Sequence, residues 1–434
     1  MISQTLPWND KGFLRSLLAY RAESTLLEQF DLDCDGVFQE KPEVIEKLKE
    51  WDISVKERRV LERRIHYISN NCDMFGKYLG FPERPLSQEE TDFPLAYGML
   101  VYKDYLQVLM MFGAFYHPQN QYCIAISETA SLIFKEIMRN LESCFPNIHV
   151  LDRPPVTWGG YEIINSTYAC FDYLVKSGRA WEYYQYLSGV DLPLRTNLEM
   201  VRILKSWNGS SNMDVLNFEE FRLLGKRFED SPLPVFKSSV SVIIPRNSAE
   251  FIAYSSITRE LLTFLNGTGN SDETFWATLM GNKKLFPVPN AFEGSEIIAY
   301  KDKLQKEHSD DVNVYMQTFK EFKTVKWSYY VARMHVWNIS PKACKGFFTQ
   351  QSCVFGVEDL PSLMSQPHFI AHKLYLDYQP AALICGLKKH RDKVARLAYF
   401  DISPYNELPL VQLHNGAPLE KIKRPLWLLG ETFL

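Results

Sequence analysis

The sequence predicts an α/β fold, with a parallel sheet covered by helices on both faces and a helical region before it. From Phe93 onward, short apolar runs alternate with amphipathic helical patterns, which is typical of successive βαβ units. A hydrophobic fraction of 46% and an aromatic fraction of 14% supply a large buried core. The 434 residues allow one large domain or about two to three smaller ones. We expect a helical region at 1–90, the α/β domain at 91–390 and a C-terminal extension at 391–434.

The N-terminal region contains two segments with helical spacing of apolar residues and many charges between them. Their sequences are KPEVIEKLKEW and VKERRVLERRIHYI. The residues expected on the buried faces are Val44, Ile45 and Leu48 in the first helix, and Val60, Leu61, Ile65 and Ile68 in the second.

Five apolar runs in the α/β region are expected to be strands. They are LAYGMLVY at 95–102, YCIAI at 122–126, NIHVL at 147–151, EYYQYL at 182–187 and SVSVII at 239–244. Helices are expected at 103–117, 131–144, 160–178 and 248–265. In open α/β sheets, ligands bind beyond the carboxyl ends of the strands. We therefore expect functional side chains in the loops after Ile126, Leu151 and Leu187, and in the DET segment at 272–274.

Charge and cysteine content restrict the class of protein and its compartment. The net charge of −4 and the pI near 6.2 exclude a molecule-wide positive field for nucleic acid. No run of 18 apolar residues occurs, so we expect no membrane span in this chain and no signal peptide at its start. Eight cysteines without a C-x-x-C pair favour disulfides and an oxidising compartment. Four N-glycosylation sequons agree with this, at Asn165, Asn208, Asn266 and Asn338.

Metal and nucleotide motifs are not supported. The acidic run DLDCDG begins at Asp31, but the position where a calcium loop requires a bidentate Glu is Pro42. We interpret this run as a solvated acidic turn. His368 and His372 have the spacing of one helical turn, yet Phe369 stands where the zinc-protease motif has its Glu. P-loop, dinucleotide-binding and G-x-S-x-G motifs are absent from the sequence.

Several segments in collinear order resemble one known family. They are DFPLAYGMLVY, YHPQNQYCIAI, WGGYEIINSTYACFDYLV and YLSGVDLPLRTNLEMVRILK, followed by SDETFWATLM, VKWSYY and QSCVFGVEDLPSLMSQPHFIAHKLYLDYQPAALICG. They resemble the core-2/I-branching β-1,6-N-acetylglucosaminyltransferases, a family that also includes the peptide O-xylosyltransferases. The resemblance extends over residues 30–390. It implies a Rossmann-like glycosyltransferase fold of the metal-independent A type, with 91–390 as the catalytic domain.

The family's disulfide arrangement uses all eight cysteines of this chain. Transferred position by position, it pairs Cys34 with Cys385, Cys72 with Cys144, Cys123 with Cys170 and Cys344 with Cys353. The residues alone would leave 105 pairings open.

The resemblance also implies a catalytic base and an acceptor site. The base is expected at Glu273, with Asp272 capping the helix that follows. Trp327 and Tyr329 match aromatic residues that line the acceptor sugar. Without the resemblance, Glu273 reads equally well as a first-turn helix acid, and both aromatics read as core residues. Further basic candidates near the acceptor are Arg195, Lys226 and Arg227.

Two positions of the implied donor site depart from the family. The family holds the diphosphate with an Arg before the second cysteine of a short loop and a Lys in the following helix. Lys373 matches the Lys, but Gln350 stands at the Arg position, and Lys345 is a candidate to compensate. Ser127 stands where the family has an Asp that contacts uracil.

The sequence is therefore interpreted as an inverting glycosyltransferase that moves N-acetylglucosamine from UDP-GlcNAc to a 6-hydroxyl of an O-glycan. No metal or cofactor is expected. Two alternatives stay open: another donor such as UDP-xylose, or a catalytically impaired protein that serves as a glycan-binding scaffold. We expect a glycoprotein acceptor, no nucleic-acid partner, a homodimer as one oligomeric option, and the Golgi lumen, as a type II membrane protein whose anchor lies outside this chain.

Overall fold

The computed structural model describes residues 25–310, 327–338, 343–396 and 399–430, together with Leu17, Tyr20 and Asn313. The chain begins with η1 (Leu26–Gln29), α2 (Cys34–Phe38), α3 (Pro42–Glu50), α4 (Val55–Ile68), α5 (Cys72–Leu79) and α6 (Gln88–Thr91). The acidic run forms the start of α2, where Asp33 accepts a hydrogen bond from the backbone of Gly36 at 2.9 Å. It is thus a helix cap on the surface.

The helices of the N-terminal region bury the expected faces with one exception. Ile45 and Leu48 of α3 are buried, as are Leu61, Ile65 and Ile68 of α4. Ser54 and Glu57 form a capping box at the start of α4. The prediction for Val60 is wrong: its side chain is 56% exposed. The buried residues of α4 follow i, i+4, i+7 spacing from position 61, and position 60 lies about 100° away from that stripe.

A five-stranded sheet forms the centre of the molecule, in the order β3-β2-β1-β4-β8. Its strands are β1 (Leu95–Val101), β2 (Gln121–Ser127), β3 (Ile148–Arg153), β4 (Tyr183–Ser188) and β8 (Ile243–Pro245). The first four are mutually parallel, as predicted. β8 pairs antiparallel with β4 and uses only the end of the expected run 239–244. A short apolar run carries no signal of direction, which is set by the connection that leads into the strand.

The two faces of the sheet join different apolar clusters. Tyr97 and Ile124 pack in the cluster that contains α7 (Tyr105–Phe115) and α8 (Leu132–Cys144). Ala96 and Ala125 point to the other face, into the cluster that contains α9 (Tyr161–Lys176). This alternation follows from the period of two in a strand, and it covers the sheet on both faces.

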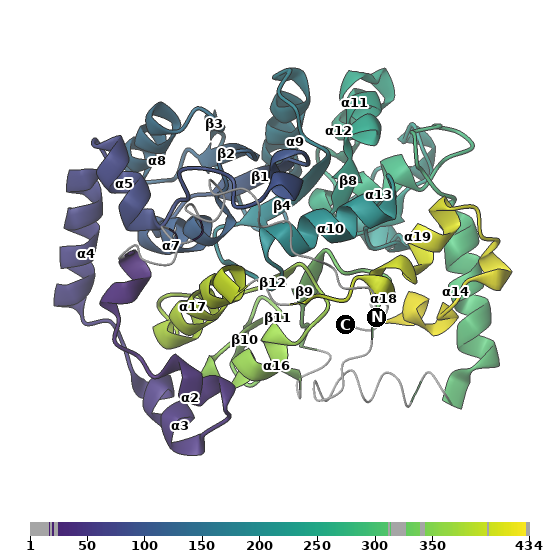
Figure 1. The fold of residues 1–434 in the computed structure, drawn as a ribbon. Helices are drawn as coiled ribbons and strands as arrows, with labels where there is room; N and C mark the ends of the chain where they lie inside the picture. Colours follow the sequence, from purple (N-terminus) through teal and green to yellow (C-terminus); the bar gives the residue numbers. More distant parts are fainter. Residues whose placement is uncertain are drawn as a thin grey trace.

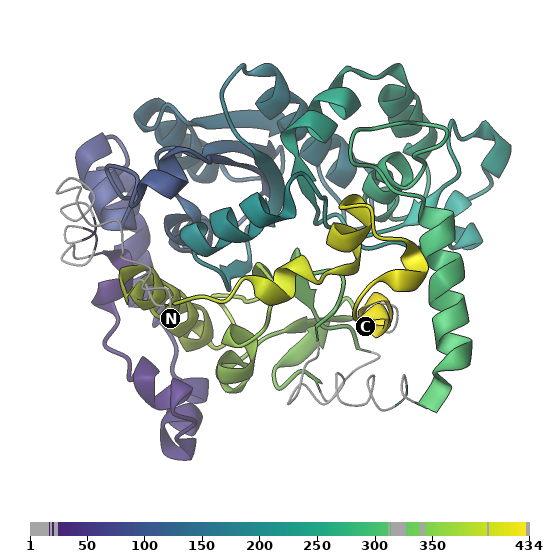
Figure 2. The ribbon, with the colours of Figure 1, turned by 45° about the vertical axis from the view of Figure 1, so that its right-hand side comes forward.

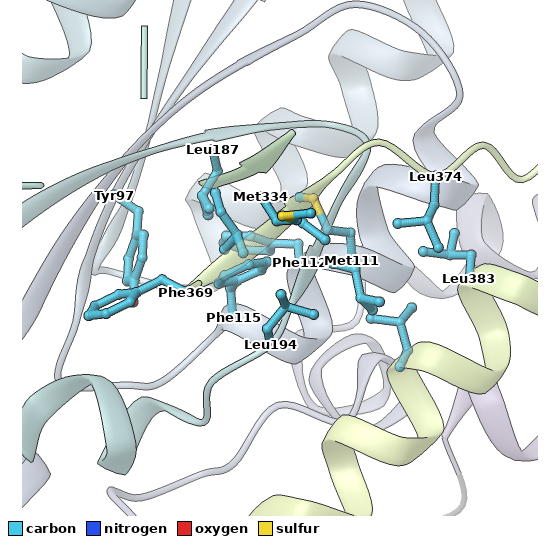
Figure 3. Close-up of a cluster of buried hydrophobic side chains, with 14 of the residues drawn as sticks. Tyr97, Met111, Phe112, Phe115, Leu187, Leu194, Met334, Phe369, Leu374 and Leu383 are labelled. Atoms are coloured by element: carbon cyan, nitrogen blue, oxygen red, sulfur yellow. The ribbon is translucent and has the colours of Figure 1, made fainter. Parts of the chain in front are cut away.

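A second, smaller sheet lies below the first (Figure 1). It has the order β5-β12-β9, with β5 (Asp191–Pro193), β9 (Arg333–His335) and β12 (Ile370–His372). α17 (Pro380–Arg396) packs beside it and against α7. Apolar side chains from both sheets and these helices meet in one cluster (Figure 3), including Tyr97, Phe112, Leu194, Met334, Phe369 and Leu383. The two sheets are therefore held together by a continuous core.

The remaining elements lie around these sheets. A hairpin of β10 (Phe347–Thr349) and β11 (Ser352–Val354) turns at Gln350 and Gln351, whose φ angles are 49° and 64°. The other elements are α10 (Asn197–Trp207), β6 (Leu216–Asn217), η2 (Glu220–Leu223), η3 (Phe228–Asp230), β7 (Phe236–Lys237), α11 (Arg246–Tyr254), α12 (Ser256–Leu265), η4 (Ser271–Glu273), α13 (Phe275–Met280), α14 (Gly294–Glu307), η6 (Val357–Asp359), α16 (Leu360–Met364), α18 (Ser403–Asn406), α19 (Pro409–His414), η7 (Leu419–Lys421) and η8 (Pro425–Leu429).

The C-terminal extension is part of the same core. In Figure 2 its yellow segment crosses from α17 toward α14, and Tyr405, Val411 and Leu428 belong to the cluster that contains α7. The expected boundary at residue 390 falls inside α17. Among the described helices, none has both the length and the apolar character that a membrane crossing requires.

All four predicted disulfides are confirmed. Cys34 of α2 joins Cys385 of α17, with 351 residues between them in the sequence. Cys72–Cys144 links α5 to α8, and Cys123–Cys170 links β2 to α9. Cys344–Cys353 closes the hairpin segment. The structure contains no free cysteine among these eight.

Candidate active site

Glu273 ends the short helix η4, which packs against α9 and α13. Its side chain is 23% exposed, and its carboxylate lies 2.8 Å from the guanidinium of Arg222. The turn before it is fixed because the backbone N–H of Asn270 donates to the carbonyl of Gly159 at 3.1 Å. An accessible carboxylate held by one ion pair has a defined position and can still accept a proton.

Asp272 does not cap the helix that follows, so that expectation is wrong. The helix α13 begins after Thr274, and no side chain caps it. Burial, together with the neighbouring charge of Glu273, raises the pKa of the Asp272 carboxyl well above its ordinary value. The charge of Asp272 also adds to the raised pKa of Tyr186 on β4, after the effects of burial and of Asp191.

Arg222 is a site residue that sequence reasoning missed. It lies on η2, its side chain is 5% exposed, and its Nε donates to Glu219 at 2.6 Å. One guanidinium therefore holds two carboxylates, those of Glu219 and Glu273. No spacing pattern connects η2 with the DET segment, so only the fold could reveal this contact.

Ser127 lies at the carboxyl end of β2 and is fully buried. Its hydroxyl is 2.9 Å from that of Thr129 and accepts a hydrogen bond from the backbone of Val156 at 3.1 Å. It thereby joins the loop after β2 to the loop after β3. The second loop carries Trp158, which is 64% exposed and which sequence reasoning did not single out.

Lys373 and the turn at Gln350 lie next to each other, as the resemblance implied. The Lys373 ammonium donates to the carbonyl of Thr349 at 3.3 Å, and Gln350 is the next residue, exposed in the hairpin turn. The expectation that Lys373 lies in a helix is wrong, because it follows strand β12 directly. Burial, and then the charge of Lys103, lower the pKa of Lys373 to about 8.

A buried polar network supports the residue before Lys373. Nδ1 of His372 lies 2.9 Å from Asp191, and the guanidinium of Arg333 lies 3.1 Å from the same carboxylate. Ser188 donates its hydroxyl to Asp191 at 2.9 Å. Burial and the charge of Arg333 lower the pKa of His372 to about 4, so its ring is neutral near pH 7. The network fixes the end of β12, and with it the position of Lys373.

His372 and His368 do not lie on one helix, contrary to the spacing read from the sequence. His372 belongs to strand β12, and His368 precedes it as a fully buried residue. Within the described ranges, no group of three His, Cys, Asp or Glu side chains is arranged to hold a metal ion.

Residues on the Lys373 side of the site contact the end of β4. The Arg333 guanidinium lies 5.2 Å from the ring centroid of Tyr186, and Asp191 accepts hydrogen bonds from Ser188. The network that supports Lys373 therefore lies at the carboxyl end of β4. This is where open α/β sheets bind ligands.

The two aromatic acceptor candidates have different surroundings. Trp327 is partly buried, and its ring stacks on Trp427 at 5.5 Å and meets the edge of Tyr405 at 4.6 Å. Tyr329 has no exposed area, and its hydroxyl bonds to Asp214 and accepts from Lys301 at 3.2 Å. Contact of either ring with an acceptor sugar stays a prediction.

The other basic candidates have internal or local partners. Arg195 is buried and donates to the hydroxyl of Tyr405 at 2.6 Å and to the carbonyl of Gln366. Lys226 donates to backbone carbonyls. Arg227 pairs with its neighbour Asp230 at 2.7 Å. Lys345 is exposed in the hairpin segment, and its backbone N–H donates to Asp359 at 2.8 Å. Because Arg195 binds the hydroxyl of Tyr405, it stabilises the C-terminal segment.

Comparison with known proteins is consistent with this arrangement. A family model described as "Core-2/I-Branching enzyme" matches residues 95–326. The chain is 25% identical over 395 residues to beta-1,3-galactosyl-O-glycosyl-glycoprotein beta-1,6-N-acetylglucosaminyltransferase 4 of Mus musculus, covering 85% of this chain and 80% of the relative. It is 26% identical over 366 residues to enzyme 3 of that name from Ovis aries, covering 79% and 78%. A probable enzyme 7 of Homo sapiens is 26% identical over 360 residues, covering 77% and 76%.

Proposed function

Because the chain belongs to the Core-2/I-branching enzyme family and is a glycosyltransferase of that family, we propose that it transfers N-acetylglucosamine from UDP-GlcNAc to a 6-hydroxyl of an O-glycan. The names of its relatives, which are β-1,6-N-acetylglucosaminyltransferases, support the sugar and the linkage. The observation that carries the proposal is the accessible carboxylate of Glu273, held 2.8 Å from the guanidinium of Arg222.

In this proposal, Glu273 acts as the general base of an inverting displacement. The acceptor 6-hydroxyl oxygen attacks the anomeric carbon of the donor as its proton passes to the Glu273 carboxylate. The bond between that carbon and the diphosphate oxygen breaks on the opposite side, and UDP leaves with the electron pair. Positioning the base in this way contributes about 10²–10⁴-fold to such a rate.

The leaving diphosphate requires positive charge on its side of the reaction. Lys373 supplies an ammonium that is 5% exposed, and its position is fixed by the neighbouring strand. Its attraction for the diphosphate grows as negative charge develops on the departing oxygen, so it stabilises the transition state more than the ground state. We propose that this charge acts without a metal ion or cofactor.

The cystine content supports a proposal for the compartment. Four disulfides are typical of proteins that fold in an oxidising lumen. We place the protein in the Golgi lumen, where an O-glycan acceptor would meet a sugar nucleotide. A homodimer is part of the same proposal, and sedimentation of the purified chain tests it.

A second candidate function has its own support. Gln350 and Ser127 are uncharged where the family carries an Arg and an Asp, and this favours a protein that keeps the fold and binds glycans without turnover. Loss of one charge-assisted bond to a phosphate costs about 1.5–3 kcal/mol.

A panel of radiolabelled sugar nucleotides, incubated with mucin-type acceptors, tests these possibilities together. We expect label to move from UDP-GlcNAc to a 6-position, located by linkage analysis of the product. Transfer from UDP-xylose in its place would assign a different donor to the same fold. Glycan binding without transfer from any nucleotide would support the scaffold function and contradict ours.

A further inference from the structure

Lys103 and Lys373 belong to distant parts of the chain, yet both contact the ring of Tyr375. Lys103 follows β1, and Lys373 follows β12. Their ammonium groups lie 5.8 Å and 5.4 Å from the ring centroid of one residue, Tyr375. The charge of Lys103 acts on Lys373 strongly enough to lower its pKa. Two strand ends thus present two cations to the same region.

Neither cation has an acidic partner within the described part of the chain. The nearest acid in sequence, Asp104, is engaged elsewhere: it lies 2.8 Å from Arg58 and accepts a hydrogen bond from the backbone of Gln107 at 3.1 Å. Lys373 is 5% exposed, and among the described residues its ammonium donates a hydrogen bond to the Thr349 carbonyl. An ammonium has three N–H donors, so its hydrogen-bonding capacity is not filled.

This arrangement is unfavourable in the free protein. A buried ammonium loses hydration, and a second positive charge nearby adds repulsion, so both effects disfavour the charged form. An anion between the two lysines would offset both costs. A diphosphate carries at least two negative charges and therefore matches two cations better than one.

We infer that Lys103 is the second cation of the diphosphate site, and that it supplies from the loop after β1 the charge that Gln350 lacks in the hairpin turn. The identity of the ligand as a nucleotide diphosphate rests on the proposed function. The pairing of Lys103 with Lys373 rests on the ring of Tyr375 that both contact and on the effect of the Lys103 charge. Within the described residues, Lys345, the candidate chosen from the sequence, makes no hydrogen bond to Lys373 and does not share this ring.

Calorimetric titration with UDP, uridine and inorganic pyrophosphate tests this inference. The proteins are the parent, Lys103→Ala, Lys103→Arg and Lys373→Ala. Lys306→Ala is the matched control, because Lys306 is an exposed lysine on α14, at the far edge of the molecule from β12 (Figure 1). Circular dichroism confirms that each variant is folded.

We expect Lys103→Ala to weaken the binding of UDP and of pyrophosphate about tenfold, and to leave the affinity for uridine unchanged. Lys103→Arg keeps the positive charge and should bind UDP and pyrophosphate as the parent does. Lys306→Ala should match the parent. Unchanged UDP affinity in folded Lys103→Ala would overturn the inference while leaving the transferase function intact. Pyrophosphate binding that depends on Lys103, without any UDP binding, would support the anion site and contradict the nucleotide donor. A parent protein that binds neither ligand would overturn the inference.

Discussion

Glu219 and Glu273 bind one guanidinium, that of Arg222, from two different segments of the chain. Nε of Arg222 donates to Glu219 at 2.6 Å, and its other side lies 2.8 Å from Glu273. The two carboxylates share a partner, but only Glu273 belongs to the DET segment to which the base is assigned. Substituting each carboxylate in turn therefore separates loss of the proposed base from loss of an ion pair with Arg222.

Glu273→Gln keeps the size of the side chain but cannot accept the acceptor's proton. We expect turnover to fall about 10²–10⁴-fold, with UDP affinity nearly unchanged, because the base acts on the acceptor side of the reaction. Initial rates with the labelled donor and calorimetry with UDP measure the two quantities. Glu219→Gln is the matched control and should lose less than tenfold. Full activity in Glu273→Gln would exclude this residue as the base.

The affinity for UDP should depend on pH through Lys373. Its pKa of about 8 means that the ammonium is charged below that pH and neutral above it, so the electrostatic contribution is lost as pH rises. We expect UDP to bind roughly three- to tenfold more weakly at pH 9 than at pH 7. Lys373→Arg stays charged over this range and should flatten the profile. A parent profile identical to that of Lys373→Arg would contradict the assignment.

Gln350→Arg should be a gain-of-function change. Gln350 is exposed and adjacent to Thr349, whose carbonyl accepts from Lys373, so a longer cationic side chain there can reach the same anion. We expect UDP affinity or the transfer rate to rise about tenfold. Gln351→Arg places the same charge one residue further along the turn and serves as the control. If Gln350→Arg and the parent bind UDP equally well, the missing Arg is no handicap in this protein.

The disulfide that closes the longer loop should contribute more to stability, because the entropy of loop closure grows with the logarithm of loop length. Replacing Cys34 and Cys385 by Ser removes a link across a sequence separation of 351, whereas replacing Cys344 and Cys353 removes a link across a separation of 9. In the chain-entropy model these changes cost roughly 6 and 2–3 kcal/mol of unfolding free energy. Denaturant unfolding measures the difference, and thiol titration of the native parent should find no free thiol. Titratable thiols in the folded parent would contradict the pairing.

Activity should not require a divalent metal. The charge expected to stabilise the leaving diphosphate comes from Lys373, so removing metal ions should leave the transfer rate within about twofold of the untreated enzyme. Rates measured with and without a chelator provide the comparison, with a manganese-dependent glycosyltransferase as positive control. Loss of activity that manganese restores would show that a carboxylate site was wrongly dismissed.

Much of the local structure could be predicted from periodicity. The runs around Met99, Ile124 and Val150 are strands because alternate residues face two apolar clusters. Predictions were wrong where one local sequence pattern is compatible with two different structures. The segment HFIAHK has the histidine spacing of a helix, yet β12 forms there because Ile370 and His372 pair with both β5 and β9. The antiparallel direction of β8 could likewise not be predicted, because the composition of a strand does not encode its direction.

The sequence by itself determined the family resemblance, the cystine pairs it implies and the positions of Glu273, Gln350 and Lys373, because these depend on residue identity in collinear segments. Only the tertiary structure decided which side chains share a charge environment. Arg222 meets Glu273 from η2, and Lys103 and Lys373 approach the ring of Tyr375 from the ends of strands in two sheets. Ion pairs and repulsion depend on distance through space, and a folded chain brings together residues that no sequence spacing connects.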